Sequence, residues 1–178
     1  LSDDILNLGR RCEEQLMSAA QSLQEGDSEL AREVISADIE INRRHHHIET
    51  ETINTIIRWQ PMAIDLRFLI SAMKISGELE RIGDYAVNIA KRGIRIEETI
   101  DAEPMDLILK MVDVCRSMLS KSLKSFREND VDGAISVWHT DDKIDKLFTK
   151  FISRVSKLLK TTSDGDSMTH LLFIGRCL

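Results

Sequence analysis

Three oxygen-bearing side chains, Glu80, Asp84 and Asn88, follow one another at intervals of four residues. The apolar residues around them recur at the three-and-four spacing of a helix, which predicts that all three lie on one helical face. Asp38 and Asn42 form a second row with the same spacing earlier in the chain. Carboxylate and amide oxygens bind hard or borderline cations such as magnesium, manganese, calcium or iron. The two rows therefore indicate a metal site.

The earlier row recurs about a hundred residues later as Asp141 and Asp145. When the sequence is shifted by 103 residues, identical residues align from Cys12 with Cys115 to Ile41 with Ile144, and Asp38 aligns with Asp141. A period this long is typical of a duplicated small bundle rather than of a solenoid repeat. We therefore expect both halves of the chain to share one fold.

Each half is predicted to hold three helices. In the first half these cover residues 3–25, 27–59 and 61–96, with Asp27 or Ser28 as the cap of the second and Pro61 in the opening turn of the third. The second half repeats the plan with helices over 104–128, over 130–160 and from Met168 onward, after a turn at 161–167.

The fold class expected from this pattern is all-α, with two three-helix bundles in tandem. The first bundle covers residues 1–98 and the second covers 103–178, and the end of the sequence truncates the last helix. The scarcity of breaking residues, with 2 prolines and 8 glycines, favours long helices over strands.

The two acidic rows of the first half are expected to meet. Asp38 lies 22 residues before Gln60, where helices two and three reverse direction, and Ile82, between Glu80 and Asp84, lies 22 residues after it. Antiparallel helices advance equally per residue, so the rows should reach the same height. Carboxylates at one level repel each other unless a cation or a basic side chain compensates, and Arg43 and Arg81 are nearby candidates.

Composition limits the possible functions. The net charge of −6 argues against binding to nucleic acid. We find no apolar run long enough to span a membrane and no secretory pattern, so a cytoplasmic protein without membrane insertion is expected. The 3 cysteines are far apart and are interpreted as core thiols. The sequence also contains no phosphate-binding loop and no catalytic triad, and we predict that it is not an enzyme.

A run of three histidines and the two tryptophans are interpreted as structural residues rather than as ligands. Consecutive helical positions point about 100° apart, so at most one of His45, His46 and His47 is expected to face a site, and the run is interpreted as a solvated patch. Trp59 and Trp138 are expected to pack at the ends of the bundles.

The chain resembles the PhoU family of phosphate-signalling proteins. The most specific stretches are residues 60–67 (QPMAIDLR) and 78–90 (ELERIGDYAVNIA), and residues 37–42 and 140–145 match more weakly. The resemblance implies two three-helix bundles that carry multinuclear clusters of iron or of another divalent cation such as zinc, manganese or magnesium. It places Glu80, Asp84 and Asp38 in the first cluster, which is expected to be weaker because Asn42 stands where an aspartate is common. Asp141 and Asp145 would belong to the second.

The resemblance also implies a function. It predicts a cytoplasmic negative regulator of phosphate uptake and phosphate-starvation signalling, homodimeric and peripheral to the membrane through its partners. These partners would be the ATPase subunit of a phosphate ABC transporter and a sensor histidine kinase. Two alternatives stay open: a carboxylate-bridged helical-bundle metalloprotein, either a metal store or an enzyme, and a structural adaptor whose acidic rows bind nothing. Di-iron bundle enzymes add a Glu-x-x-His pair on two helices, which this sequence lacks in register.

Overall fold

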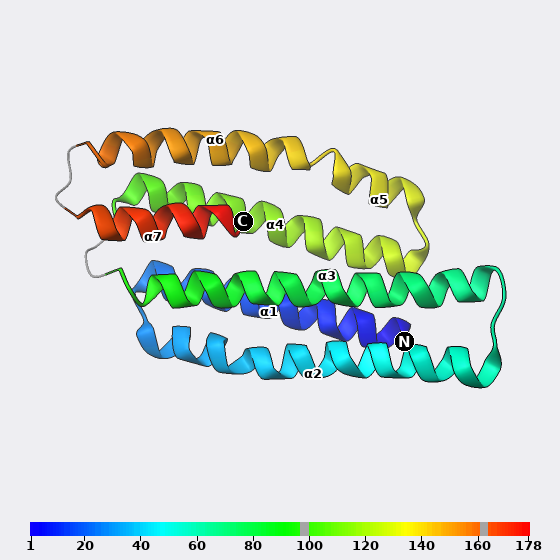
Figure 1. Ribbon diagram of the computed structural model, residues 1–178. Helices are drawn as coiled ribbons and strands as arrows, with labels where there is room; N and C mark the ends of the chain where they lie inside the picture. Colours follow the sequence, from blue (N-terminus) through cyan, green and yellow to red (C-terminus); the bar gives the residue numbers. More distant parts are fainter. Residues whose placement is uncertain (97–99, 161–163) are drawn as a thin grey trace.

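The computed structural model describes residues 1–96, 100–160 and 164–178. Within these ranges the chain forms seven α-helices and no strand, which confirms the all-α prediction (Figure 1). The helices are α1 (Ser2–Glu25), α2 (Ser28–Trp59), α3 (Ile64–Gly93), α4 (Ala102–Glu128), α5 (Val131–Trp138), α6 (Asp141–Leu158) and α7 (Gly165–Arg176).

Helices α1, α2 and α3 lie side by side in an antiparallel arrangement (Figure 1). The first ends at Gly26, whose φ of 64° is the left-handed conformation that glycine adopts without strain. Asp27 then caps α2 as predicted, because its side chain accepts hydrogen bonds from the backbone N–H groups of Glu29 and Leu30. At 32 residues, α2 is about 48 Å long and reaches past the first residue of α1, as does its partner α3.

The third helix begins later than predicted. Pro61 lies in the connecting loop and α3 starts at Ile64, because Ala63 has a positive φ of 50° that is incompatible with a right-handed helix. Proline fixes its own φ, but it does not determine the conformation of the second residue after it. The helix ends at Gly93 rather than at Ile96.

The single helix predicted over residues 130–160 is wrong, because the chain breaks between α5 and α6 at His139 and Thr140. The Thr140 hydroxyl donates a hydrogen bond to the Ser136 carbonyl at 3.1 Å, and the Thr140 N–H bonds to the Val137 carbonyl at 2.8 Å. A threonine side chain that bonds to the preceding turn competes with regular helical pairing. The aligned residue in the first half is Ala37, where α2 continues without a break.

The last helix begins at Gly165, three residues before the predicted start at Met168. Asp164 caps it by accepting a hydrogen bond from the Ser167 N–H at 3.0 Å. Residues 161–163 of the predicted turn, and the predicted end of the first bundle at residue 98, lie outside the described residues.

The buried core is shared between the two halves. Helix α1 packs on α4, and α3 packs on α7. One buried cluster joins Leu16 and Ile89 of the first half to Met111 and Phe151 of the second. Another contains Leu119 and Leu123 of α4 together with apolar residues of α1, α2 and α3. The halves therefore pack along their length rather than standing apart.

Candidate functional site

The row on α2 contains an unsatisfied carboxylate oxygen. Asn42 Nδ2 donates a hydrogen bond to Asp38 Oδ2 at 2.9 Å. The other oxygen, Asp38 Oδ1, is buried and has no hydrogen-bond partner among the described residues. Buried polar atoms are nearly always paired, so an unpaired carboxylate oxygen indicates a place for a cation or an ordered water.

Asp38 and Glu80 approach the same buried thiol. Cys12 of α1 donates a hydrogen bond through its Sγ to the Leu79 carbonyl of α3 at 3.1 Å. Burial, followed by the negative charges of Asp38 and then Glu80, raises the pKa of Cys12 from 9.0 to about 12. The negative charges of both rows, on α2 and α3, thus act on one sulfur atom of α1.

Contacts between α2 and α3 define the register of the rows. The His45 ring nitrogen Nδ1 lies 3.1 Å from Ser76 Oγ. One turn earlier on α2, the Cδ1 atom of Ile41 lies 3.0 Å from where a Cβ would stand on Gly83. Asp38 therefore lies opposite the turn of α3 that follows Gly83. The glycine permits this close approach of the two helices, which offsets its low helix propensity.

Gln15 of α1 is a site residue that the sequence analysis missed. Its Nε2 donates to the Val34 carbonyl at 3.0 Å, one turn before Asp38. Its Oε1 lies 3.1 Å from the position of a Cβ on Gly83 and, like Asp38 Oδ1, has no partner within the described ranges. The signal available in the sequence was an amide on the buried stripe that also carries Cys12 and Leu16.

The other members of the rows are more accessible. Asp84 and Asn88 are exposed on α3, as are Asp141 and Asp145 on α6. In the part of the chain that the structure describes, Asp38, Glu80 and Asp84 do not form a group whose ligand atoms all lie within 4.8 Å of one another. This register places Asn42 near the level of Glu80 and Asp38 near the level of Asp84, and the exposed row residues face solvent.

The arginines considered as compensating charges pair elsewhere. Arg43 binds Glu40 with two hydrogen bonds of 2.8 Å, which lowers the pKa of that carboxyl group to about 2. Arg81 binds Glu78 at 2.9 Å. Across the described residues, no lysine or arginine forms an ion pair with Asp38 or Glu80. Within the described ranges, neither carboxylate is therefore neutralised by a basic side chain.

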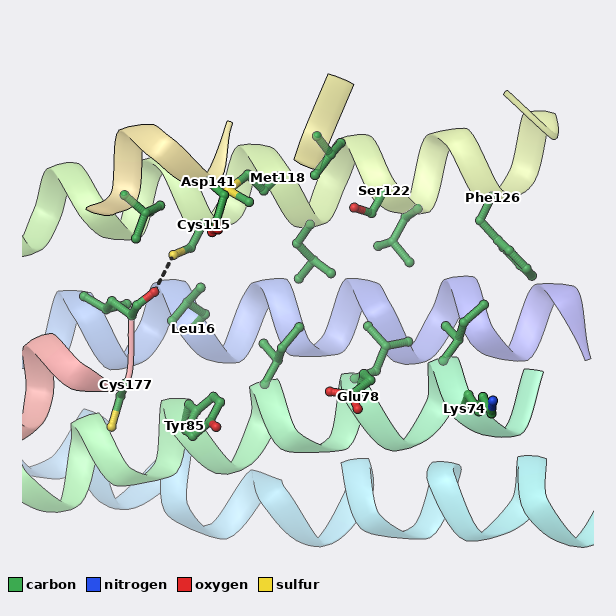
Figure 2. Close-up of a pocket in the computed structure, with 18 residues that line it drawn as sticks. Leu16, Lys74, Glu78, Tyr85, Cys115, Met118, Ser122, Phe126, Asp141 and Cys177 are labelled. Atoms are coloured by element: carbon green, nitrogen blue, oxygen red, sulfur yellow. Dashed lines mark hydrogen bonds between the residues drawn. The ribbon is translucent and has the colours of Figure 1, made fainter. Parts of the chain in front are cut away.

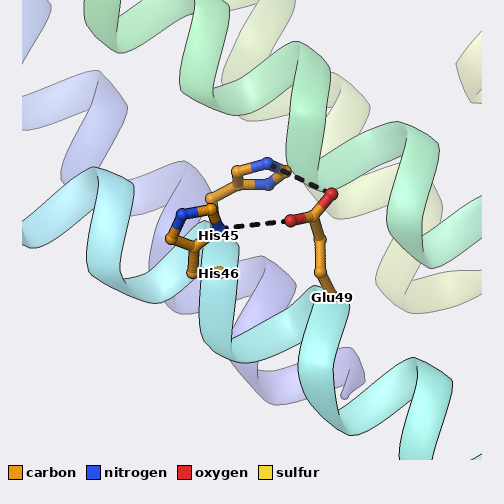
Figure 3. A group of neighbouring side chains, drawn as sticks. All are labelled: His45, His46 and Glu49. Carbon is orange, nitrogen blue, oxygen red and sulfur yellow. Dashed lines mark hydrogen bonds and ion pairs between the residues drawn. The ribbon is translucent and has the colours of Figure 1, made fainter.

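A histidine cluster on α2 was not expected. His45 Nε2 lies 3.5 Å from Glu49 Oε1, and His46 Nδ1 lies 3.2 Å from Glu49 Oε2 (Figure 3). One ligand atom from each of the three residues lies within 4.8 Å of the others, and no other such group occurs among the described histidine, cysteine and acidic residues. Two rings thus approach one carboxylate, whereas the expectation that at most one histidine faces a site stays a prediction. Glu49, three and four residues further on, lies between the two rings.

An apolar groove of about 570 Å³ runs between α3, α4 and the start of α6 (Figure 2). Its α3 edge carries Lys74, Glu78 and Tyr85, and Asp141 lies at its opposite side. Cys115 Sγ donates a hydrogen bond to the Leu178 carbonyl at 3.3 Å across one end. A mainly apolar lining with two acidic groups does not suit a free phosphate ion.

Large apolar side chains are exposed at the connection between α2 and α3. The two tryptophans are exposed as well, so the expectation that they pack at the bundle ends is wrong. Trp59 is 78% exposed and Trp138 is 77% exposed. The residues around the α2–α3 connection, here called the hairpin tip, share this exposure: Ile57, Trp59, Met62 and Ile64. The connection between α2 and α3 lies beyond the N-terminal end of α1 (Figure 1).

The fold and the rows define a duplicated helical bundle with acidic side chains on the long helices of its first unit. The family model of the PhoU domain matches residues 5–93 and 108–178. The chain belongs to the PhoU family, which confirms the resemblance found in the sequence.

Relatives and solved structures agree with this membership. A phosphate-specific transport system accessory protein PhoU homolog of Caulobacter vibrioides is 29% identical over 100% of this chain and 78% of its own length. A PhoU homolog 1 of Methanothermobacter thermautotrophicus is 33% identical over 90% of this chain and 74% of its own length. The crystal structure of PhoU from Pseudomonas aeruginosa superposes with a TM-score of 0.93 at 28% identity, covering 98% of this chain and 85% of the other. No helix in the described ranges is both long and apolar enough to cross a bilayer.

Proposed function

We propose that this protein is a cytoplasmic negative regulator of phosphate uptake and phosphate-starvation signalling that acts through protein contacts and catalyses no reaction. One observation carries the proposal: over its whole length the chain matches a relative named as an accessory protein of a phosphate-specific transport system. A solved neighbour is described as a phosphate transport system regulatory protein and superposes with a TM-score of 0.91 at 29% identity, over 98% of this chain and 83% of the other.

The acidic rows are proposed to hold metal ions in the first half of the chain. Asp38, Asn42 and Glu80 would form the inner part of the site, and Asp84 and Asn88 the outer part. The support is the buried Asp38 Oδ1, which lacks a partner among the described residues. An all-oxygen set suits iron, manganese or magnesium better than soft metals, and the ion would supply positive charge that offsets the carboxylates.

The metal proposal is tested by replacing Glu80 and Asp84 together with alanine. Glu80 is half-buried and Asp84 is exposed, so neither belongs to the apolar core and helicity should persist. The metal content of the purified protein, measured by inductively coupled plasma mass spectrometry, should fall. The matched control replaces Asp65 and Glu78, two exposed carboxylates of the same helix that lie off the row. Equal metal content in the two variants would contradict the site. Replacing Asp141 and Asp145 tests a second site on α6 in the same way.

The hairpin tip is proposed to contact the ATPase subunit of a phosphate transporter. Its exposed Trp59, Met62 and Ile64 form an apolar surface of the kind that marks protein contacts. The relatives are named as accessory to a transport system, so a component of that system is the partner we commit to.

Purified ATPase subunit should bind the chain and lose at least tenfold in affinity when Trp59 and Met62 are both serine. Trp138→Ser, which removes an equally exposed tryptophan at the end of α5 in the other half of the chain, is the control. Unchanged affinity of the tip variant would refute the surface. If the variant instead loses binding to a sensor histidine kinase, the tip binds the kinase. If its mass by light scattering falls from that of a homodimer to that of a monomer, the tip is the dimer interface.

Hydrolytic or oxidase turnover by the metal-loaded chain would favour the carboxylate-bridged metalloenzyme.

A further inference from the structure

We propose that His45, His46 and Glu49 form a second metal site on α2, separate from the acidic rows, that takes a borderline dication such as Zn²⁺. The side chains come from three positions within one and a third turns of a single helix (Figure 3). The site does not depend on the proposed regulatory function.

The spacing of the ligand atoms suits tetrahedral coordination. Zinc binds imidazole nitrogen and carboxylate oxygen at about 2.0–2.2 Å, which separates neighbouring ligands by roughly 3.3 Å. The two histidine nitrogens lie 3.5 Å and 3.2 Å from the oxygens of Glu49. One ligand atom from each of the three residues lies within 4.8 Å of the other two, so the three can converge on one cation.

The surroundings fix the orientation of His45. Ser76 Oγ donates its hydrogen to the Met73 carbonyl at 2.9 Å, so toward His45 it acts as an acceptor. In this arrangement His45 Nδ1, 3.1 Å away, donates to Ser76, which leaves Nε2 facing Glu49 and available to a cation or a second proton. A lone pair facing a carboxylate oxygen is unfavourable unless a cation or a proton lies between them. Outer hydrogen bonds of this kind orient metal-binding histidines in proteins.

The exposure of one side of the cluster to water, and the pairing of the nearby arginines with Glu40, also favour a bound ion. The side chains of His45 and Glu49 are 17% and 35% exposed, whereas His46 is 81% exposed, so one side of the cluster is open to water. Three protein ligands and an open position are typical of zinc sites that keep a water molecule. Both neighbouring arginines pair with Glu40, which leaves Glu49 to the histidines.

The ligand chemistry separates this site from the acidic rows. Two imidazole nitrogens and one carboxylate favour zinc, nickel or copper over magnesium, calcium or manganese. The rows contain only oxygen ligands and have the opposite preference. The two sites should therefore respond to different metals in the same chain.

The test is calorimetric titration of the full chain with ZnCl₂ in excess magnesium, with Glu80 and Asp84 replaced by alanine so that the row does not contribute. One zinc per chain is expected to bind. His45→Ala and Glu49→Gln should each weaken binding more than tenfold, and Ser76→Ala should weaken it about tenfold through loss of orientation. His47→Ala is the matched control, since it removes an adjacent exposed histidine outside the cluster and should leave the affinity unchanged.

Nitrogen-15 spectra of the histidine rings give a second readout, and circular dichroism confirms that each variant is folded. Zinc should shift Nε2 of His45 and leave its Nδ1 protonated. No binding in the parent chain, equal binding in the Glu49→Gln and His47→Ala variants, or a shift at His47 instead of His45 would overturn the proposal. A histidine–carboxylate ion pair would then account for the cluster.

Discussion

At the scale of a single residue, Cys12 of α1 interacts with groups on both α2 and α3. Its thiol lies against the Leu79 carbonyl of α3, and the charges of Asp38 and Glu80 act on it from α2 and α3. A deprotonated sulfur at this position would be both buried and next to like charges. The folded chain therefore holds the thiol proton more tightly than the unfolded chain does.

This difference predicts a pH dependence of stability. The pKa of Cys12 is about 12 in the folded state against an ordinary 9.0, so above pH 9 the unfolded chain loses a proton that the folded chain keeps. The free energy of unfolding should fall as pH rises through this window, by up to about 1.4 kcal/mol per pH unit, and Cys12 should have no such effect below it. Urea unfolding of the wild type and of Cys12→Ala, in a chelator at pH 8 to 11, measures both slopes.

The alanine variant will be less stable at every pH because it leaves a cavity, so the comparison concerns the slopes alone. A shallower decline in the variant is expected. Parallel slopes would show that Cys12 does not retain its proton in the folded state.

At the residue scale, the sequence was most informative where helical periodicity determines which side chains lie on one face. The four-residue spacing places Glu80 and Asp84 on one helix. Counting from Gln60 predicts Asp38 at the level of Ile82, between them, whereas the contacts of α2 with α3 place it opposite the turn that follows Gly83. The burial of single side chains could not be predicted in this way. The packing of α1 and α2 against α3 determines how much of each α3 side chain is exposed. The angular separation of consecutive histidines does not include Glu49, three and four residues further on, so the His45–Glu49 pair was not predicted.

At the scale of the helix, an aspartate precedes four of the described helices, and its side chain caps three of them but not α4. Asp27 accepts hydrogen bonds at 2.9 Å and 3.0 Å from the first turn of α2. Asp101 precedes α4, and within the described residues its side chain makes no capping bond. The same residue type at equivalent positions should therefore differ in its contribution to stability.

Asp27→Ala should lower the free energy of unfolding by about 1 kcal/mol, since two backbone N–H groups lose their acceptor. Asp101→Ala should change it by less than about 0.5 kcal/mol. Equilibrium denaturation of the two single variants measures the difference. An equal loss in both would contradict the capping role of Asp27.

Helix boundaries could be predicted where local chemistry decides them. Gly26 and Asp27 punctuate the chain in the expected way, and α2 runs from Ser28 to Trp59 as the pattern indicated. The break at Thr140 could not be predicted, because the first half continues as a helix through the aligned Ala37. A threonine hydroxyl can bond to the preceding helical turn, but it does not always do so. Tertiary packing decides whether the helix breaks there.

At the scale of the whole molecule, the shared core makes the two halves of the duplication energetically dependent. Phe151 of α6 is fully buried in a cluster that also contains Leu16 and Ile89 of the first half. Periodicity identifies which face of a helix is buried but not the partner that buries it. The packing of α1 on α4 was therefore absent from the sequence-based description of two bundles.

Phe151→Ala should lower the free energy of unfolding by about 3–5 kcal/mol, as expected for loss of a buried aromatic ring. The most protected amides of α1 and α4 should lose stability by the same amount, because the core joins the two helices. Native-state hydrogen exchange measures both in one experiment. Protection lost in α4 but retained in α1 would show that the halves unfold independently.

The exposure of the two tryptophans has a practical consequence. The chain holds 2 tryptophans, one in each half, and both stand in solvent at helix ends. Their fluorescence is thus a built-in optical probe of what touches the ends of α2 and α5. A chain with Trp138 replaced by phenylalanine emits from the hairpin tip alone, so a blue shift on adding a partner would report docking there without any attached dye.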